Sequence, residues 1–278
     1  MQNESPMMTS RDAVAPPVRR ALIPCGGKGT RMLSITHGTA KELIPVAGRA
    51  ALTWVIAECA ASGIEELLIV ISPEKQAIVD AVAPLAGQTG APRRIEFAVQ
   101  EEPRGLADAI RHGRDFAGDD PLAVALPDNI FIGAAPGLAE VIETFEAIGS
   151  SAVAIVEISA EEGARRGPTA IYDGTLDGDV FRIAKIPSKG DKKSVFDTKG
   201  AASAFTGVGR YVFTLEVWPT IDEVARTLAP GAELDDIPVM QSLLARNRLV
   251  GRRMRGRFLD IGLPQGYEEA NALLSSDV

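Results

Sequence analysis

Three closely spaced glycines are the first feature of this sequence that could take part in chemistry. Gly26, Gly27 and Gly29 directly follow a short apolar run, and a polar and a basic residue come next, Thr30 and Arg31. Backbone N–H groups in such a loop can surround phosphate oxygens, because no side chains obstruct the approach. The structural alternative is a glycine turn that serves packing alone.

Two familiar phosphate motifs fit this loop poorly. The P-loop ends in Gly-Lys followed by Ser or Thr, whereas this loop reads Gly29-Thr30-Arg31. The dinucleotide fingerprint requires a third glycine, and Met32 occupies its position. The incomplete fingerprint disfavours an NAD-dependent oxidoreductase. Arg31 and Lys41 bring positive charge close to the loop, which favours phosphate binding over packing.

The segments around the loop must position it, and they alternate between apolar runs and helical patterns. Apolar runs predict strands at positions 20–24, 67–71, 95–99, 122–126 and 152–158. Helical spacing predicts helices at 51–62, 106–116 and 138–148, with another opened by Ser72 and Pro73. This alternation predicts parallel strands joined by crossover helices, hence a doubly wound, mostly parallel α/β sheet.

Several candidate residues fall just after predicted strands. The glycine loop follows the first strand, Gln100 follows the third, and Asp128 follows the fourth. Ligands of doubly wound sheets bind beyond the carboxyl ends of the strands. We therefore expect the glycine loop, Gln100 and Asp128 to line one crevice.

The second half of the chain is less regular. Residues 173–204 are rich in Asp, Gly, Lys and Ser, which predicts strands separated by a loop at 188–194. The pattern then predicts a strand at 208–213, a helix at 237–245, a strand end at 259–260 and a helix that begins at Pro264. We expect one domain over residues 19–278 after a disordered tail at 1–18, with an additional smaller β-rich part that binds substrate.

Composition and charge exclude several classes of protein. The 278 residues are 46% apolar and 24% charged, as expected of an ordinary globular protein. No apolar run approaches the ~18 residues that span a bilayer, and the start of the chain lacks the apolar core of a secretory signal. Two cysteines, Cys25 and Cys59, are too few for a disulfide framework, so we expect a cytoplasmic protein. The net charge of −8 disfavours nucleic acid as a partner but allows a small polyanionic substrate.

The residues around the glycine loop resemble a known family. Positions 21–32 read ALIPCGGKGTRM and positions 41–46 read KELIPV, and together they resemble the signature of the sugar-1-phosphate nucleotidyltransferases. Within that family the chain is most similar to the bacterial UTP–glucose-1-phosphate uridylyltransferases. Further matching segments follow in the family's order, at Gln100 with 105–109, and at 126–129, 209–212 and 259–262.

The resemblance implies a fold and a reaction. The fold is the Rossmann-like nucleotidyltransferase fold, in which the smaller β-rich part binds the acceptor. In the reaction, a phosphate oxygen of a sugar 1-phosphate attacks the α-phosphorus of a nucleoside triphosphate in line, and pyrophosphate leaves from the opposite side. The expected pair is UTP and glucose 1-phosphate. Because both reactants are anions, positioning and charge neutralisation dominate such catalysis.

The same resemblance implies roles for individual residues. Arg31, Lys41 and Asp128 are the implied catalytic residues, and the two basic ones neutralise the triphosphate and the leaving group. Asp128 and Asp260 are implied to hold Mg²⁺, a hard ion that prefers carboxylate and phosphate oxygens. Lys185 is implied to bind the phosphate of the acceptor. Base contacts come from Gln100 and Gly105, in a nucleotide-binding set completed by Gly26, Gly27, Gly29, Thr30 and Glu42.

Each implied role has a structural alternative. Asp128 and Asp260 could cap turns, which is a common use of aspartate after a strand. Lys41 could be a solvated loop residue, and Lys185 could be a charge at a strand edge. The resemblance also implies a homo-oligomer, although nothing in the composition indicates one.

Several positions depart from the family on the acceptor side. Ala184 stands where the family has a sugar-binding glutamate, Ala204 where an asparagine is expected, and Ala170 aligns with an expected glycine. The run at 236–241 also differs from the family's pattern. Lost polar groups should change acceptor preference, so a rare sugar, a cyclitol phosphate or a phosphonate is an alternative acceptor. The chain could also use dTTP, CTP, ATP or GTP, or be a non-catalytic regulator that binds a nucleotide sugar.

Overall fold

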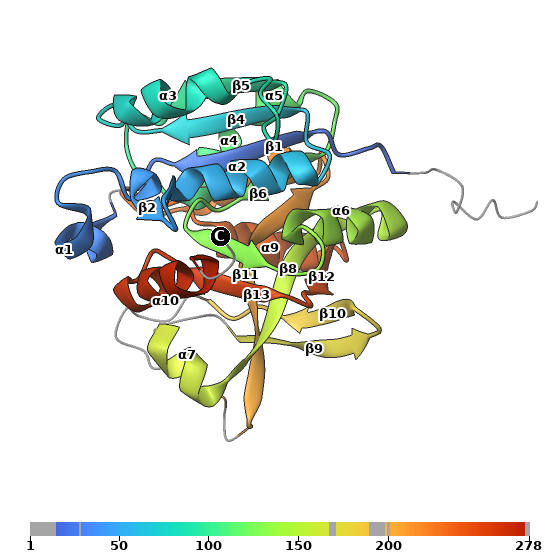
Figure 1. Cartoon of the computed structure of the whole chain (residues 1–278). Coiled ribbons are helices and arrows are strands. Elements are labelled where there is room, and N and C mark those ends of the chain that lie inside the picture. The colour runs from blue at the N-terminus through green and yellow to red at the C-terminus, as the bar shows by residue number, and fades with distance from the viewer. Residues whose placement is uncertain (1–14, 28, 167–170, 189–197, 199–200, 276–278) are drawn as a thin grey trace, which may run out of the picture.

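The computed structural model describes residues 15–27, 29–166, 171–188, 198 and 201–275. A nine-stranded sheet crosses these residues in the order β5-β4-β1-β6-β11-β8-β12-β10-β9 (Figure 1). Its strands are β1 (Arg20–Cys25), β4 (Glu66–Ile71), β5 (Arg94–Val99), β6 (Leu122–Ala125), β8 (Ser151–Ser159), β9 (Ile171–Asp177), β10 (Val180–Lys185), β11 (Ser203–Phe213) and β12 (Leu249–Arg253).

The strand directions confirm the predicted doubly wound, mostly parallel sheet. β5, β4, β1 and β6 are parallel to one another, and β8 is parallel to β12. β11 lies between β6 and β8 and is antiparallel to both, so β6 and β8 run the same way. β11 begins five residues before the strand predicted at 208–213, and its first half also pairs with β9.

Helices cover both faces of the sheet, as a doubly wound arrangement requires. Along β1, Ala21 and Ile23 belong to one apolar core and Leu22 to the other, because successive side chains of a strand point to opposite faces. The first core is closed by α2 (Ala51–Ala61), α3 (Gln76–Val82) and α6 (Gly137–Ile148). The second is closed by α4 (Leu106–Arg111), α5 (Arg114–Ala117), α8 (Val217–Thr227) and α9 (Asp236–Ala245).

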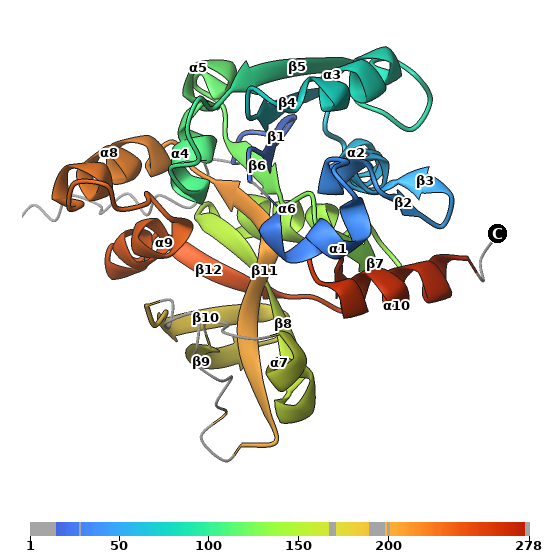
Figure 2. The same cartoon turned by 90° about the vertical axis from the view of Figure 1, so that its left-hand side faces the viewer.

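A third, smaller core lies beside the main sheet. Its buried residues include Met32, Ile44 and Ile261. Helix α1 (Leu33–Thr36) follows the glycine loop, and Figure 2 shows α10 near the β2–β3 hairpin. This core is built from β2 (Pro45–Val46), the start of α2, β7 (Asn129–Ile132), β13 (Arg257–Asp260) and α10 (Pro264–Leu274), and β2 pairs with β3 (Arg49–Ala50). Nowhere in the described part of the chain is a helix both long and apolar enough to cross a bilayer.

The additional β-rich part consists of the antiparallel strands β9 and β10, and helix α7 (Ala160–Arg166) packs against β8, which precedes it. Figures 1 and 2 both show this part beyond the β8–β12 side of the sheet, away from β5. The ring of Phe181 in β10 lies 4.7 Å from that of Phe205 in β11, which joins the two parts. Most of the predicted loop at 188–194 and of the predicted tail at 1–18 lies outside the described residues, and Val18 is buried in the first core.

Two predicted helices differ from the structure. Ser72 does not begin a helix, because residues 72–75 form a turn in which the backbone N–H of Lys75 donates to the carbonyl of Ser72 at 3.0 Å. Helix α3 begins only at Gln76. The helix predicted at 106–116 is divided into α4 and α5. The break lies at Gly113, where a β-carbon would come within 2.8 Å of leucine side chains from β1 and β6, so the chain passes unusually close to the sheet.

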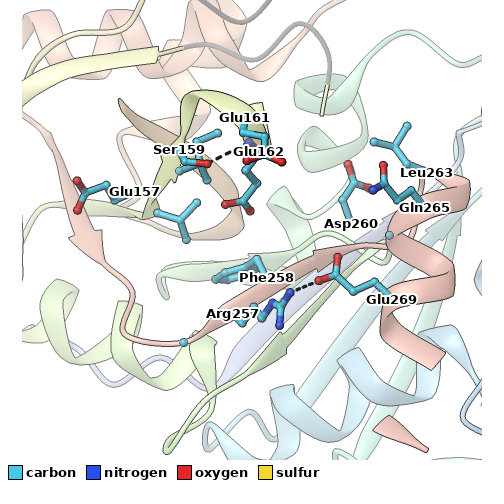
Figure 3. A pocket seen from close by; sticks show the side chains of 14 residues that line it. Glu157, Ser159, Glu161, Glu162, Arg257, Phe258, Asp260, Leu263, Gln265 and Glu269 are labelled. Atoms are coloured by element: carbon cyan, nitrogen blue, oxygen red, sulfur yellow. Dashed lines mark hydrogen bonds and ion pairs between the residues drawn. The ribbon is translucent and has the colours of Figure 1, made fainter. Parts of the chain in front are cut away.

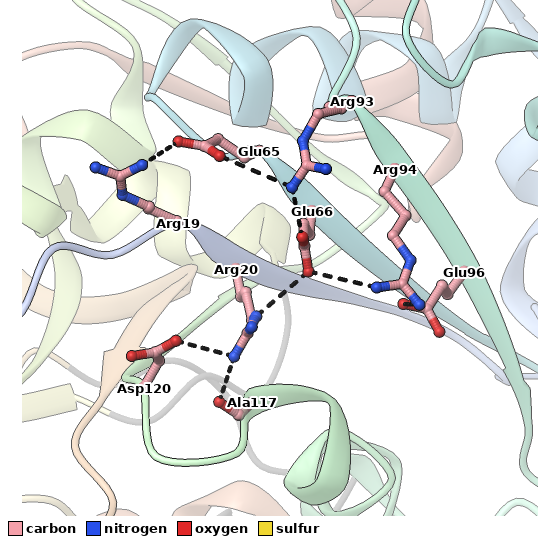
Figure 4. Close-up of polar contacts among 9 residues, drawn as sticks. All are labelled: Arg19, Arg20, Glu65, Glu66, Arg93, Arg94, Glu96, Ala117 and Asp120. Atoms are coloured by element: carbon pink, nitrogen blue, oxygen red, sulfur yellow. Dashed lines mark hydrogen bonds and ion pairs between the residues drawn. The ribbon is translucent and has the colours of Figure 1, made fainter.

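An ion-pair network joins the amino ends of β1, β4 and β5 (Figure 4). The glycine loop follows the opposite, carboxyl end of β1. Glu66 accepts from Arg20 at 3.4 Å and from Arg93 at 2.6 Å, and it lies 3.8 Å from Arg94. Arg20 also reaches Asp120 at 2.9 Å. The side chain of Glu66 is only 15% exposed and accepts from two arginines, so the network ties the amino ends of these strands together.

Candidate active site

The glycine loop follows β1, and its three glycines differ in their surroundings. A β-carbon at Gly26 would lie 2.6 Å from Oε1 of Gln100, so a larger residue would displace that side chain. Gly29 has a φ of +62°, and the stem of Lys41 packs 3.4 Å from the position of a β-carbon there. Gly27 is exposed and has nothing within 4 Å of that position. The backbone at Gly27 is therefore open to an approaching ligand.

A buried ion pair holds the glycine loop in place. The ammonium of Lys75, which is 8% exposed, donates to the carbonyl oxygens of Cys25 at 2.7 Å and Gly27 at 2.6 Å. It also donates to both carboxylate oxygens of Glu42 at 2.9 and 3.1 Å. Glu42 is 1% exposed, so its carboxylate is committed to Lys75 within this structure. Burial, followed by the charge of Glu42, raises the pKa of the Cys25 thiol well above its usual value, so this thiol stays neutral.

Lys41 and Asp128 form an ion pair at the carboxyl end of the sheet. Nζ of Lys41 donates to Oδ2 of Asp128 at 2.6 Å, and the two side chains are 16% and 18% exposed. Burial lowers the pKa of Lys41, but the charges of Asp128 and Glu42 and the hydrogen bond with Asp128 together outweigh this effect and raise the pKa. Burial raises the pKa of Asp128, but the charge and hydrogen bond of Lys41, together with the charge of Arg31 and a backbone hydrogen bond, outweigh it and lower the pKa. Both groups therefore stay charged at neutral pH.

Asp260 is brought beside Asp128 by the pairing of β7 with β13. In that ladder Asp260 lies opposite Asn129, and the backbone N–H of Ile261 donates to the carbonyl of Asp128 at 2.9 Å. A β-carbon at Gly262 would lie 2.9 Å from Oδ2 of Asp128 and 3.0 Å from Oδ1 of Asp260. The two carboxylates thus converge on one small space. Burial, followed by the charge of Asp128, raises the pKa of Asp260.

A second buried ion pair supports the turn that carries Asp128. The fully buried guanidinium of Arg210 donates to the two carboxylate oxygens of Glu58 at 2.9 and 2.7 Å. It also donates to the carbonyl oxygens of Leu126 at 3.2 Å and Asn129 at 2.7 Å. Because these two carbonyls flank Asp128, the buried ion pair fixes the turn from both sides.

The other end of the site is formed by the segment after β5. The backbone N–H of Gln100 donates to the carbonyl of Ile71 at 2.8 Å, and its side chain is nearly buried at 4% exposed. Nε2 of Gln100 donates to Oδ2 of Asp108 at 2.7 Å. Gly105 has a φ of +111°, and a β-carbon there would lie 2.4 Å from the carbonyl oxygen of Leu234. Only glycine fits this crowded position.

A cavity of about 460 Å³ joins these groups. Arg31 is exposed and follows the glycine loop. Burial and Lys41 have the larger effects on the pKa of Asp128, and the charge of Arg31 lowers this pKa further. Asp260 lies beyond this cavity, next to Asp128. The predicted site residues that line the cavity are Gly26, Gly27, Thr30, Lys41, Glu42, Gln100, Gly105 and Asp128.

A second cavity of about 410 Å³ adjoins Asp260 (Figure 3). It lies between the end of β8, helix α7 and the first turns of α10. Among the described residues that line it, Arg257 is the single basic side chain, and it is paired with Glu269. The cavity therefore has more negative than positive charge and differs from the phosphate-binding chemistry expected at the glycine loop. Its other carboxylates come from Glu157, Glu161, Glu162 and Asp260.

The predicted acceptor residue Lys185 is not brought to these groups. It is exposed at the end of β10 and lines neither cavity, so its role stays a prediction. Ala184 is exposed beside it, whereas Ala204 is 9% exposed and packs in the first core. Ala170 lies outside the described residues. In the run at 236–241, Gln241 donates to the backbone just after β10 at 2.7 Å, which is a structural contact.

Sequence reasoning missed both buried ion pairs. Arg210 lies within one of the segments that resemble the family, but nothing local pairs it with Glu58, which is 152 positions away. Lys75 falls near the start of a predicted helix, where a lysine is ordinarily solvated. The only usable signal is the type of residue: a lysine or arginine beside apolar strands must find partners once it is buried.

Comparison with known proteins agrees with this geometry. The sequence profile described as nucleotidyl transferase matches residues 20–277. A UTP–glucose-1-phosphate uridylyltransferase of Bacillus subtilis is 29% identical and is aligned over 90% of this chain and 88% of its own length. A UDP-glucose pyrophosphorylase complexed with UDP-glucose has a TM-score of 0.79 at 23% identity, over 94% of this chain and 100% of its own. A UTP-bound UGPase from Acinetobacter baumannii has a TM-score of 0.74 at 20% identity, over 94% of each chain.

The solved structures have the same fold as this chain. The family profile extends over the glycine loop, both aspartates and α10. The profile match covers far more than half of the chain, which establishes the family and the type of reaction. This chain therefore belongs to the nucleotidyl transferase family and is an enzyme that transfers nucleotidyl groups.

Proposed function

We propose that this nucleotidyltransferase joins UTP to a sugar 1-phosphate, with glucose 1-phosphate the expected acceptor, and releases pyrophosphate. One observation carries the proposal: the open glycine loop and the Lys41–Asp128 ion pair line one cavity, and Asp260 lies next to Asp128. The similarity to UTP–glucose-1-phosphate uridylyltransferases supports the choice of substrates.

The nucleotide is proposed to extend from Gln100 to the glycine loop. The base would lie at Gln100 and Gly105, and the triphosphate would lie over Gly27, where the backbone is open. Glu42 is assigned a supporting role, because its carboxylate holds Lys75 and thereby the loop. This division agrees with the cavity, whose lining extends from Gln100 to Asp128.

Lys41 and Arg31 are proposed to supply the positive charge that the reaction needs. A bond forms between a phosphate oxygen of the acceptor and the α-phosphorus, while the bond from that phosphorus to pyrophosphate breaks. Negative charge develops on the leaving group, so a cation held in place beforehand stabilises the transition state. Lys41 is held by Asp128, and Arg31 lies near enough for its charge to act on Asp128.

Asp128 and Asp260 fit a divalent cation. Their oxygens converge on a space at Gly262 that a β-carbon would fill. Within the described ranges no group of three or more His, Cys, Asp or Glu side chains could hold a metal ion. Two carboxylates are nevertheless sufficient for Mg²⁺, which usually takes its remaining oxygens from water and substrate phosphates. Such an ion would neutralise phosphate charge when bound.

Pyrophosphate release tests the proposal. UTP, dTTP, CTP, ATP and GTP would each be offered with Mg²⁺ and a panel of acceptors that includes glucose 1-phosphate. We expect release with UTP and glucose 1-phosphate, its loss in Asp128→Asn, and normal activity in Asp177→Asn, whose carboxylate is 67% exposed on β9. Release only with a different pair would keep the chemistry and reassign the substrates.

The alanines at 184 and 204 keep the alternative acceptors open, namely a rare sugar, a cyclitol phosphate or a phosphonate. A protein that bound nucleotide sugar but released no pyrophosphate with any pair would instead be the non-catalytic regulator. The single domain over residues 19–278, the cytoplasmic location and the homo-oligomer likewise stay predictions.

A further inference from the structure

The carboxylate of Asp108 decides which end of the Gln100 amide faces the cavity. Nε2 of Gln100 donates to Oδ2 of Asp108 at 2.7 Å and more weakly to the carbonyl oxygen of Gly105 at 3.4 Å. A carboxylate and a carbonyl only accept hydrogen bonds, so the amino end of the amide must face them. The amide oxygen, Oε1, must therefore face the other way.

Oε1 of Gln100 is poised for a ligand. It lies above the glycine loop, 2.6 Å from where a β-carbon of Gly26 would stand, and no described residue donates a hydrogen bond to it. Gln100 and Gly26 both line the cavity, and only 4% of Gln100 is exposed. Oε1 is not one of the fully enclosed polar atoms that lack a partner, so a donor on a ligand in the cavity can reach it.

We propose that Asp108 is a specificity-determining residue that holds Gln100 as a hydrogen-bond acceptor toward the base. The inference rests on the proposed function, because it assumes that the base of a nucleotide lies at Gln100. Uracil and thymine carry a ring N–H at N3, which can donate to Oε1. Cytosine has a lone pair on N3, so two acceptors would face each other and both would stay unpaired. The site thus selects UTP over CTP.

Asp108 is needed because the Gln100 amide alone does not discriminate between uracil and cytosine. Rotating the Gln100 amide by 180° exchanges its oxygen and amino ends without changing its shape. With Asp108 present, that rotation would direct the amide oxygen at a carboxylate oxygen. With asparagine in its place, either orientation of Gln100 finds a partner, because asparagine both donates and accepts. The backbone N–H of Asp108 donates to Leu234 at 3.2 Å and is unaffected by this change.

The test compares two substrates of the same size, UTP and CTP, with glucose 1-phosphate as acceptor. The quantity of interest is the ratio of their kcat/KM values in the wild type and in Asp108→Asn. We expect this ratio to fall by about tenfold or more, the size expected when one shielded hydrogen bond ceases to discriminate. Asp115→Asn is the matched control, because this exposed aspartate lies on α5 and does not line the nucleotide cavity.

A double variant separates positioning from a structural effect. If Asp108 acts through Gln100, adding Asp108→Asn to Gln100→Met should leave the UTP:CTP ratio where Gln100→Met alone puts it. A general loss of folding lowers kcat/KM for UTP and for CTP by the same factor, so it does not change their ratio. An unchanged ratio in Asp108→Asn, or a wild type that prefers CTP, would overturn the proposal. No pyrophosphate release from the wild type with any nucleotide would instead reject the proposed function.

Discussion

Lys75→Met is the substitution that tests how the glycine loop is held. It removes an ammonium that is hydrogen-bonded to Cys25, Gly27 and Glu42 but keeps a side chain of similar length. The Glu42 carboxylate would then be buried, at 1% exposed, without its counter-ion. We expect the variant to be less stable and to bind the triphosphate poorly, because the loop loses its anchor.

The magnitude follows from the burial of the pair. Removing one partner of a buried ion pair costs about 3–5 kcal/mol of unfolding free energy, because the other charge is left uncompensated. Removing both charges in Glu42→Leu with Lys75→Met avoids that penalty, so the double variant should recover ~2 kcal/mol or more of the loss. Arg19→Met, which breaks an ion pair whose side chains are 61% and 43% exposed, should change stability by less than about 1 kcal/mol.

The assay is urea unfolding of the four proteins, followed by steady-state pyrophosphate release at temperatures where each is folded. Lys75→Met should raise the KM for UTP as well as lower stability. If its stability stays within about 1 kcal/mol of the wild type, the ion pair does not hold the loop as described. If stability falls but the KM for UTP is unchanged, the loop does not depend on Lys75.

Three further predictions concern neighbouring groups. Asp260→Asn should abolish pyrophosphate release yet raise the unfolding free energy at pH 7 without Mg²⁺, because burial and Asp128 raise the pKa of Asp260. That gain should disappear as the pH falls through the raised pKa toward ~4, which urea unfolding at the two pH values measures. Arg210→Met should cost about 3–5 kcal/mol in the same assay, because Glu58 is left unpaired. Gly26→Ala should raise the KM for UTP in initial-rate measurements, because the added methyl meets Gln100.

Local sequence patterns predict most of the parallel half of the fold. The buried strands at 20–24, 67–71 and 95–99 are recognisable because they are apolar at nearly every position, as strands covered on both faces are. Helix boundaries are less predictable, since Ser72 has the residue type of an N-cap but is followed by a turn. The break at Gly113 depends on side chains of β1 and β6, which no local window contains.

The residues of the candidate site could be predicted from the sequence, but the strand pairing and buried ion pairs that hold them in place could not. The glycine loop, Gln100 and Asp128 could be assigned to one crevice because each follows a strand of the same sheet. Asp260 lies 132 positions after Asp128, and their meeting depends on the β7–β13 pairing, so it was accessible only through resemblance. The ion pairs of Lys75 and Arg210 depend on tertiary burial, which a single sequence does not display.

The fate of labelled phosphorus tests the central claim most directly. UTP carrying ³²P at the α-position would be incubated with Mg²⁺, glucose 1-phosphate and either the wild type or Asp128→Asn. With the wild type, the label should appear in UDP-glucose, with one pyrophosphate for each labelled product, and Asp128→Asn should leave it in UTP. Label that stays in UTP with the wild type, or that appears as UMP, would contradict transfer of the uridylyl group to glucose 1-phosphate.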